Sequence, residues 1–217
     1  GCKSQYNMSH VLSGEKSLSE IIVKTRHGVM LVPGASGLQE MAALSELQSA
    51  RMVQDFSSLD GQIDVLVIDL GAGISPLVMT LLCACHHRLV VVQDDPSSIA
   101  DAYGTIKVMM KDHQLDHIHL IPNSVESEAH AQLLYQRINQ VCARYLEQTV
   151  DYLGSVERDE QILQALKKFQ SVLEYAPSSA AARDFRRLAQ AVDELPRPEE
   201  LSGGIQFFVE RWIQQKA

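Results

Sequence analysis

An aspartate at the end of a continuous apolar run is the clearest chemical signal in this 217-residue sequence. The run Ile63–Leu70 contains Asp69 near its end, and Gly71, Ala72 and Gly73 follow. A carboxylate at this place is typical of a Walker B motif, in which it helps to hold Mg²⁺ through bound water. The glycines leave the backbone free to approach a phosphate group. The alternative is that the aspartate only caps a turn or helix, and spacing alone does not separate the two.

Two further loops carry polar side chains after apolar runs. The first, Asp94-Asp95-Pro96, follows the run Arg88–Gln93, and the second is Asn123 after the run His117–Pro122. In open α/β sheets ligands bind at the carboxyl ends of the strands, so both loops are candidate binding residues. An Asn amide has the donor and the acceptor needed to recognise an adenine edge. The alternative is helix capping by Asp and Ser, with a purely structural Asn.

The segment Gly14-Glu15-Lys16-Ser17 is similar to the end of a Walker A motif, but it does not fit one. That motif is G-x-x-x-x-G-K-[ST], with a strand before it and a helix after it. Here Glu15 separates the glycine from the lysine, and neither Ser9 nor His10 is a glycine. We expect a solvated turn at this place.

The elements that must position these loops alternate along the chain. Apolar, β-branched runs predict five strands: Gly28–Pro33, Ile63–Leu70, Arg88–Gln93, His117–Pro122 and Val150–Val156. Helical periodicity predicts helices at Ser45–Phe56, from Ser75-Pro76 onward, from the cap Ser97-Ser98 to Asp112, and at Glu126–Glu147, Gln161–Tyr175 and Ala180–Glu194. This order predicts an α/β fold, a doubly wound and mostly parallel sheet with helices on both faces and further helices toward the C-terminus.

The end of the chain predicts a separate amphipathic helix. After Gly203-Gly204, one helical stripe collects the apolar residues Ile205, Phe208, Val209, Trp212 and Ile213. Such a helix can lie in a membrane interface, or it can pack on the core of its own domain. We expect a nucleotide-binding domain over residues 1–195, a linker over 196–204 and this helix over 205–217.

Charge and cysteine content exclude several classes of protein. The net charge of −8 argues against a duplex-DNA surface, which needs clustered Lys and Arg. No stretch approaches the roughly 20 apolar residues that span a bilayer. The four cysteines, Cys2, Cys83, Cys85 and Cys142, have neither zinc spacing nor the pattern of a secreted disulfide framework, so a reducing cytosol is expected.

Taken together, the three loops resemble the MinD/ParA-type P-loop ATPases. The stretch Val65–Lys107 carries most of the likeness, which is greatest to the MinD-like flagellar-number regulators, the FlhG/FleN group. The resemblance covers nearly the whole chain. It implies an ATP-dependent homodimer, Mg²⁺-dependent hydrolysis and peripheral membrane attachment through the C-terminal helix.

The resemblance also implies a role for each candidate residue. Asp69 would be the Walker B carboxylate that binds Mg²⁺ through water, and Gly71, Ala72 and Gly73 would form the second switch loop. Asn123 would contact adenine. The segment from Asp94 to Ser98, which includes Asp95 and Pro96, would line the dimer side of the nucleotide site together with Asp101.

The family further implies partners and a location. The partners would be a flagellar signal-recognition-type GTPase, a flagellar transcription activator and basal-body switch proteins. The location would be the cytoplasm and the inner face of the cell membrane, with the cell pole as one site. Two alternatives stay open: a non-catalytic MinD-like interaction module, and a ParA-type partition ATPase, which the acidic charge disfavours.

The sequence departs from the family at several places. The family's P-loop and switch-I aspartate normally precede the position of Gly1, so we expect no ATP hydrolysis by the isolated 217 residues. Glu157 stands where the family usually has proline, which puts the adenine-side loop in doubt. Leu70 and Gly71 also differ from the small or hydroxyl residue and the Pro or Ala common there.

Overall fold

The computed structural model describes residues 4–34, 46–59, 61–196 and 207. The chain divides into two compact units. Unit 1 consists of Gly1–Cys85 together with Glu200–Ala217, and unit 2 consists of His86–Glu199. The predicted division into residues 1–195, 196–204 and 205–217 stays a prediction.

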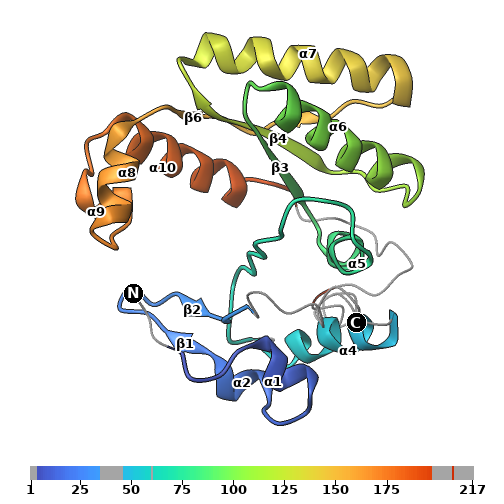
Figure 1. Cartoon of the computed structure of the whole chain (residues 1–217), viewed down its shortest axis with the longest axis vertical. Helices are drawn as coiled ribbons and strands as arrows, with labels where there is room; N and C mark the ends of the chain where they lie inside the picture. Colours follow the sequence, from blue (N-terminus) through green and yellow to red (C-terminus); the bar gives the residue numbers. More distant parts are fainter. Residues whose placement is uncertain (1–3, 35–45, 60, 197–206, 208–217) are drawn as a thin grey trace. The chain divides into compact units, whose positions relative to one another are not determined.

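Unit 2 is built on a parallel sheet (Figure 1). Its strands are β3 (Arg88–Val92), β4 (Ile118–Val125), β5 (Asp151–Tyr152) and β6 (Val156–Glu157). The strand β4 pairs in parallel with all three others. The first five residues of β4 are buried, as expected for a central parallel strand that is covered on both faces. The mostly parallel α/β sheet predicted from the sequence is confirmed.

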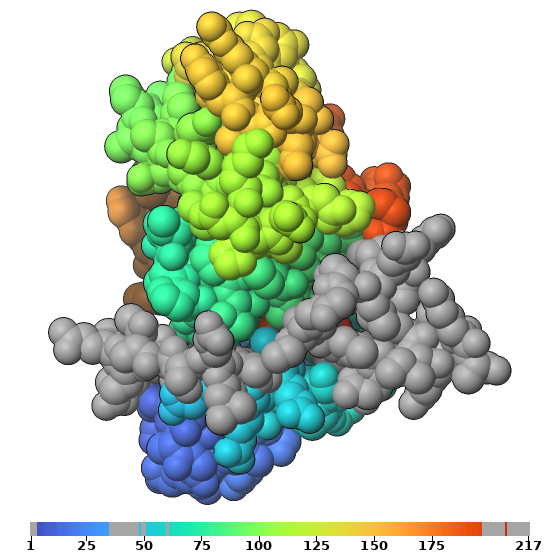
Figure 2. All heavy atoms as spheres, turned by 90° about the vertical axis from the view of Figure 1, so that its right-hand side faces the viewer, coloured from blue at the N-terminus to red at the C-terminus, as the bar shows by residue number. Residues whose placement is uncertain are grey.

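Long helices connect the strands of unit 2 and cover them. The helices α6 (Pro96–Lys111) and α7 (Glu128–Leu146) lie side by side against β3 and β4. They also form the green and yellow surface of this unit in Figure 2. Their inner faces bury Ile106, Met109, Leu134 and Ile138 almost completely. On the other side of the sheet, α10 (Ala180–Asp193) packs against β6, next to α8 (Glu160–Lys167) and α9 (Val172–Tyr175).

The start of α6 differs from the predicted cap. The N-cap is Asp95, with Pro96 in the first turn, whereas Ser97 and Ser98 had been expected to cap this helix. Proline needs no N–H donor at the first helical position, which favours this arrangement. The Ser98 hydroxyl is used elsewhere, because it accepts a hydrogen bond from the backbone N–H of Gln93 at 2.9 Å.

Two predicted elements are broken in the structure. The predicted strand Val150–Val156 is divided into β5 and β6 by three residues that include Gly154, whose φ of 152° is open mainly to glycine. The predicted helix Gln161–Tyr175 is divided into α8 and α9, and Phe169 between them has a left-handed φ of 53°. Both breaks depend on local backbone angles that apolar periodicity does not encode.

The described part of unit 1 contains short elements. They are α1 (Met8–Leu12), α2 (Leu18–Ile21), β1 (Val23–Lys24), β2 (Met30–Leu31), α4 (Glu46–Ser57) and α5 (Pro76–Ala84). The strand predicted at Gly28–Pro33 is reduced to β2, which pairs with β1 in an antiparallel hairpin. Gly14 lies in a turn with φ 76°, and Ser17 begins α2, so the prediction of a turn instead of a phosphate-binding loop is confirmed. No helix in the described part of the chain is long and apolar enough to cross a membrane.

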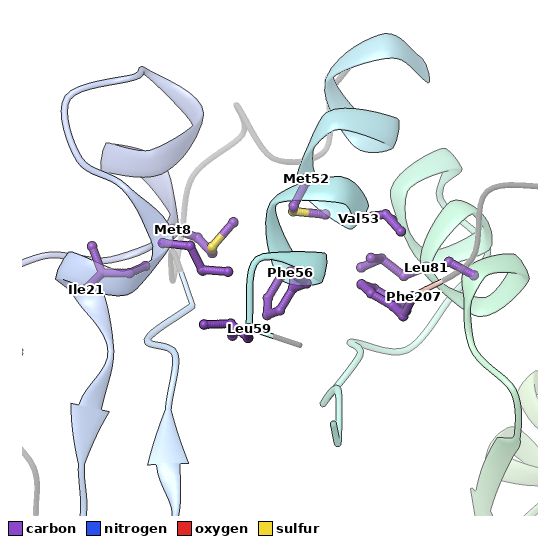
Figure 3. Packing of buried hydrophobic residues seen from close by; sticks show 10 residues of the cluster. Met8, Ile21, Met52, Val53, Phe56, Leu59, Leu81 and Phe207 are labelled. Atoms are coloured by element: carbon purple, nitrogen blue, oxygen red, sulfur yellow. The ribbon is translucent and has the colours of Figure 1, made fainter. Parts of the chain in front are cut away.

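One hydrophobic cluster holds unit 1 together (Figure 3). Met8, Ile21, Val53 and Leu81 are among its buried members. Phe207 joins this cluster from the far end of the chain: its ring meets Phe56 edge-on at 5.6 Å, and its N–H donates to the Ala84 carbonyl at 3.2 Å. The predicted membrane stripe of Ile205, Phe208, Val209, Trp212 and Ile213 lies outside the described residues.

The predicted strand Ile63–Leu70 is wrong as a paired strand. The segment joins no β-ladder with any residue that the structure describes. It keeps the alternation of an extended chain, because Leu66 and Ile68 pack against the unit 1 core while Val65 and Val67 are 63% and 80% exposed. A strand needs the backbone of a neighbour, and β-branched residues alone do not supply one.

Candidate functional site

Residues from three segments meet at the carboxyl edge of the unit 2 sheet. Val92, the last residue of β3, lies opposite Pro122 of β4. One step further along β4, Asn123 lies opposite Val156 of β6. The loop that begins at Gln93, the Asn123 side chain and the segment after β6 therefore share one edge, which is where open α/β sheets bind ligands.

Asn123 lies at an irregularity of the central strand. The register between β4 and β6 shifts between Asn123 and Val125, and Ser124 between them has a φ of 59°. Such bulges bend a strand and redirect a side chain, and they are frequent beside functional sites. Asn123 itself is half-buried. A polar side chain is thus held at a strained point of an otherwise buried strand.

Asp94 is held by two side chains from α7. One carboxylate oxygen lies 2.8 Å from the Nε2 atom of His130, and the other accepts a hydrogen bond from the Arg137 guanidinium. The backbone N–H of Glu126 donates to Nδ1 of His130, so Nε2 carries the proton that His130 donates. The hydrogen bonds from His130 and then Arg137 hold the pKa of Asp94 below its usual value. Asp94 thereby ties the loop after β3 to α7.

Asp95 and Pro96 have helix-starting roles in the same loop. The Asp95 carboxylate accepts a hydrogen bond from the Ser97 hydroxyl at 2.6 Å and from the Ser98 backbone N–H at 2.9 Å. These bonds lower the pKa of Asp95 and keep it ionised. Asp101 lies further along α6 with its side chain exposed. The capping alternative considered for this loop therefore holds for Asp95.

Two carboxylates that sequence reasoning missed fasten the end of β6 and the residues after it. Asp184 on α10 is only 7% exposed and accepts the backbone N–H of Glu157 at 2.9 Å. Asp159 begins α8 and also accepts the backbone N–H of Ala181 at 3.1 Å. Both bonds bind the segment around Glu157 to α10. One sequence signal was present, because Asp184 interrupts the apolar stripe that Ala181 and Leu188 form on α10.

The remaining predicted residues belong to unit 1. Asp69 is exposed at the end of the extended segment, and Gly71, Ala72 and Gly73 after it are exposed as well. Gly73 has a φ of 111°, and a Cβ added at Gly71 or Gly73 would meet no atom within 4 Å. The backbone here is open to close approach by a ligand.

The donor set around Asp69 fits Mg²⁺ held together with a nucleotide. Among the described residues no group of three or more His, Cys, Asp or Glu side chains is placed to hold a metal ion. Mg²⁺ usually keeps several waters and is bound by one or two carboxylates plus substrate phosphates, instead of by a cage of protein ligands. A single exposed carboxylate followed by an open glycine loop matches that pattern.

Comparison with known proteins decides the family. The family model for cellulose biosynthesis protein BcsQ matches residues 11–192. Antiactivator FleN of Pseudomonas aeruginosa is 35% identical over 217 residues, which are 100% of this chain and 78% of FleN. The chain belongs to the BcsQ/ParA–MinD family. The resemblance inferred from its sequence is confirmed.

Two other proteins are similar at lower identity. Flagellum site-determining protein YlxH of Helicobacter pylori is 28% identical over 190 residues, which are 87% of this chain but only 64% of YlxH. The septum site-determining protein MinD of Pyrococcus horikoshii, solved in complex with Mg-ADP, has a TM-score of 0.66 at 22% identity. That match covers 88% of this chain and 74% of MinD. The fold is therefore the MinD-like P-loop NTPase fold.

Proposed function

We propose that this protein regulates the number and placement of flagella, and that its intact form works as a MinD-like ATP switch. The observation that carries the proposal is the 35% identity to Antiactivator FleN along the entire chain. The similarity to YlxH, a flagellum site-determining protein, also supports a flagellar role.

In this proposal the edge of the unit 2 sheet holds the nucleoside end of ATP. Asn123 presents its amide from the bulge of β4 and pairs with the adenine edge. The loop Asp94-Asp95-Pro96 lines the dimer side of the nucleotide. Because both carboxylates are already hydrogen-bonded, they shape this loop and do not bind the metal. The hydrogen bond between Asp94 and His130 would couple a movement of this loop on ATP binding to a movement of α7.

Separate roles are proposed for residues of unit 1. Asp69 would help to hold Mg²⁺ through bound water, and the open backbone of Gly71, Ala72 and Gly73 would leave room for a phosphate group. When bound, Mg²⁺ supplies charge neutralisation of the phosphate oxygens. Asp69 and the glycine loop have the exposure that this role needs.

Partners and location follow from the same proposal. ATP would drive a homodimer, and the C-terminal stripe of Ile205, Phe208, Val209, Trp212 and Ile213 would then lie on the inner face of the cell membrane. The proposed partners are a flagellar signal-recognition-type GTPase, a flagellar transcription activator and basal-body switch proteins. Phe207, which precedes Phe208 in the sequence, is itself buried in the unit 1 core.

Flagella counted per cell test the proposed function. We expect deletion of the gene in its source organism to raise the number of flagella per cell, and a plasmid copy to restore it. The count is made on electron micrographs of growing cells. An unchanged number and position of flagella would contradict the proposal. Retention of the protein on DNA-cellulose in moderate salt would instead favour the partition-ATPase alternative.

A further inference from the structure

The helix α8 has apolar side chains on two adjacent faces, one buried and one exposed. Its inner face contributes Ile162 and Ala165 to the cluster that also contains Val156. On its outer face, Leu163 and Leu166 are each 62% exposed. These two leucines are one helical turn apart and present neighbouring side chains to solvent. The outer leucines are not needed to fill the core that the inner face already fills.

Phe169 follows α8 directly after the C-cap Lys168, in a backbone conformation that favours glycine. Its N–H donates to the Leu166 carbonyl, and the Gln170 N–H donates to the Ala165 carbonyl, both at 3.0 Å. This pair of bonds is a Schellman motif, and the residue at the position of Phe169 is usually glycine, because its φ is positive. Here φ is 53°, and the side chain is a phenyl ring that is 83% exposed.

A phenylalanine at this position strains the backbone at the end of α8, and its exposed ring lowers the solubility of the protein. A bulky residue in the left-handed region is strained, and glycine would end the helix with less strain. Because the ring is exposed, it contributes almost no hydrophobic stabilisation to the folded protein. Clustered exposed apolar side chains are instead typical of sites that bind another molecule.

The charges at the C-terminal end of this face are positive, whereas Glu160 lies one turn before Leu163 at its N-terminal end. Lys167 and Lys168 lie between Leu166 and Phe169 in the sequence, and both are exposed. No Asp or Glu occurs from residue 161 to 173, although the whole chain carries a net charge of −8. Neither lysine forms an ion pair with any residue in the described part of the chain. An acidic ligand would therefore be attracted to this face.

We propose that this surface, the α8 ridge formed by Leu163, Leu166, Phe169, Lys167 and Lys168, docks an acidic amphipathic helix of a partner protein. The Phe169 ring is the apolar anchor, and the lysines select acidic residues at the rim. Helices bind in this way through apolar residues spaced one turn apart. A lipid surface fits less well, because binding to anionic lipid uses clusters of about 4–8 Lys or Arg. The proposal does not depend on the flagellar function.

A displayed library of random 16-residue peptides, selected on the complete protein, tests this proposal. We expect the enriched peptides to carry Leu or Phe at helical spacing flanked by Asp or Glu. Affinity of a selected peptide is then measured by fluorescence anisotropy. The Phe169→Gly variant should bind at least about 10-fold more weakly, while its Tm rises by a few degrees because glycine relieves the strained cap. Loss of binding together with a gain in stability cannot come from unfolding.

Matched variants make the result specific. Tyr145 on α7 is another exposed aromatic residue, at 61%, and Tyr145→Ala should leave binding unchanged. The double change Lys167→Glu and Lys168→Glu should weaken binding of the acidic peptide about 10-fold or more. The proposal is overturned if the enriched peptides show no acidic preference, or if Phe169→Gly binds them as well as the unaltered protein. Binding to phosphatidylglycerol vesicles that requires Phe169 would also overturn it, in favour of a membrane site.

Discussion

The Asp69→Asn variant of the protein made from the complete open reading frame is expected to lose Mg²⁺-dependent ATP hydrolysis by a factor on the order of 10²–10³. Asparagine has the same shape as aspartate but no charge, so it orients the water shell of Mg²⁺ poorly. Asp69 is exposed at the end of the extended segment, so the substitution removes no buried hydrogen bond. Phosphate release is measured with Mg²⁺ and again with EDTA present.

Asp64→Asn is the matched control for this prediction. Asp64 lies in the same extended segment and is also exposed, so it shares the charge and the surroundings of Asp69 but not its place before the glycine loop. Its hydrolysis rate should stay within about a factor of two of the unaltered protein, as surface substitutions outside a site usually do. Equal loss in both variants, or full activity in Asp69→Asn, would contradict the role of Asp69.

The Gly154→Ala variant is expected to have a free energy of unfolding that is lower by about 1–3 kcal/mol, because the added methyl group overpacks the space next to α10. A Cβ at residue 154 would lie 2.9 Å from the Cδ2 atom of Leu188. The φ of 152° adds backbone strain for any side chain. Urea unfolding followed by circular dichroism measures the change in the free energy of unfolding.

Gly104→Ala makes the same chemical change, but it is expected to stabilise the protein instead of destabilising it. Gly104 is inside α6, and an added Cβ would meet no atom within 4 Å. Alanine favours a helix interior over glycine, so this variant should be more stable by roughly 0.5–1 kcal/mol. If Gly154→Ala were neutral, the close approach of α10 to the segment between β5 and β6 would not be the constraint inferred here.

The sequence predicted the long elements of unit 2 well. The apolar runs at β3 and β4 and the periodic segments at α6, α7 and α10 lie where they were expected. These elements are covered by one another, so burial reinforces the pattern that their residues already carry. Unit 1 was predicted less well, because its short hairpin and the segment Ile63–Leu70 depend on which backbone lies beside them.

The candidate site shows the same division. Asp94 after β3 and Asn123 after the apolar first part of β4 could be found from the sequence, because the ends of apolar runs are recognisable. The groups that hold them could not. His130 and Arg137 reach Asp94 from 36 and 43 residues away, and Asp184 reaches Glu157 from 27. Such contacts depend on how α7 and α10 pack on the sheet, which no local pattern specifies.

The ATP switch is tested most directly by the mass of the protein in solution with different nucleotides. The product of the complete open reading frame is measured by light scattering with Mg-ATP and with Mg-ADP, in the unaltered form and as Asp69→Asn. We predict a dimer in Mg-ATP and a monomer in Mg-ADP for the unaltered protein, and a weaker response for Asp69→Asn. The same mass in both nucleotides would contradict the switch and would favour a non-catalytic interaction module.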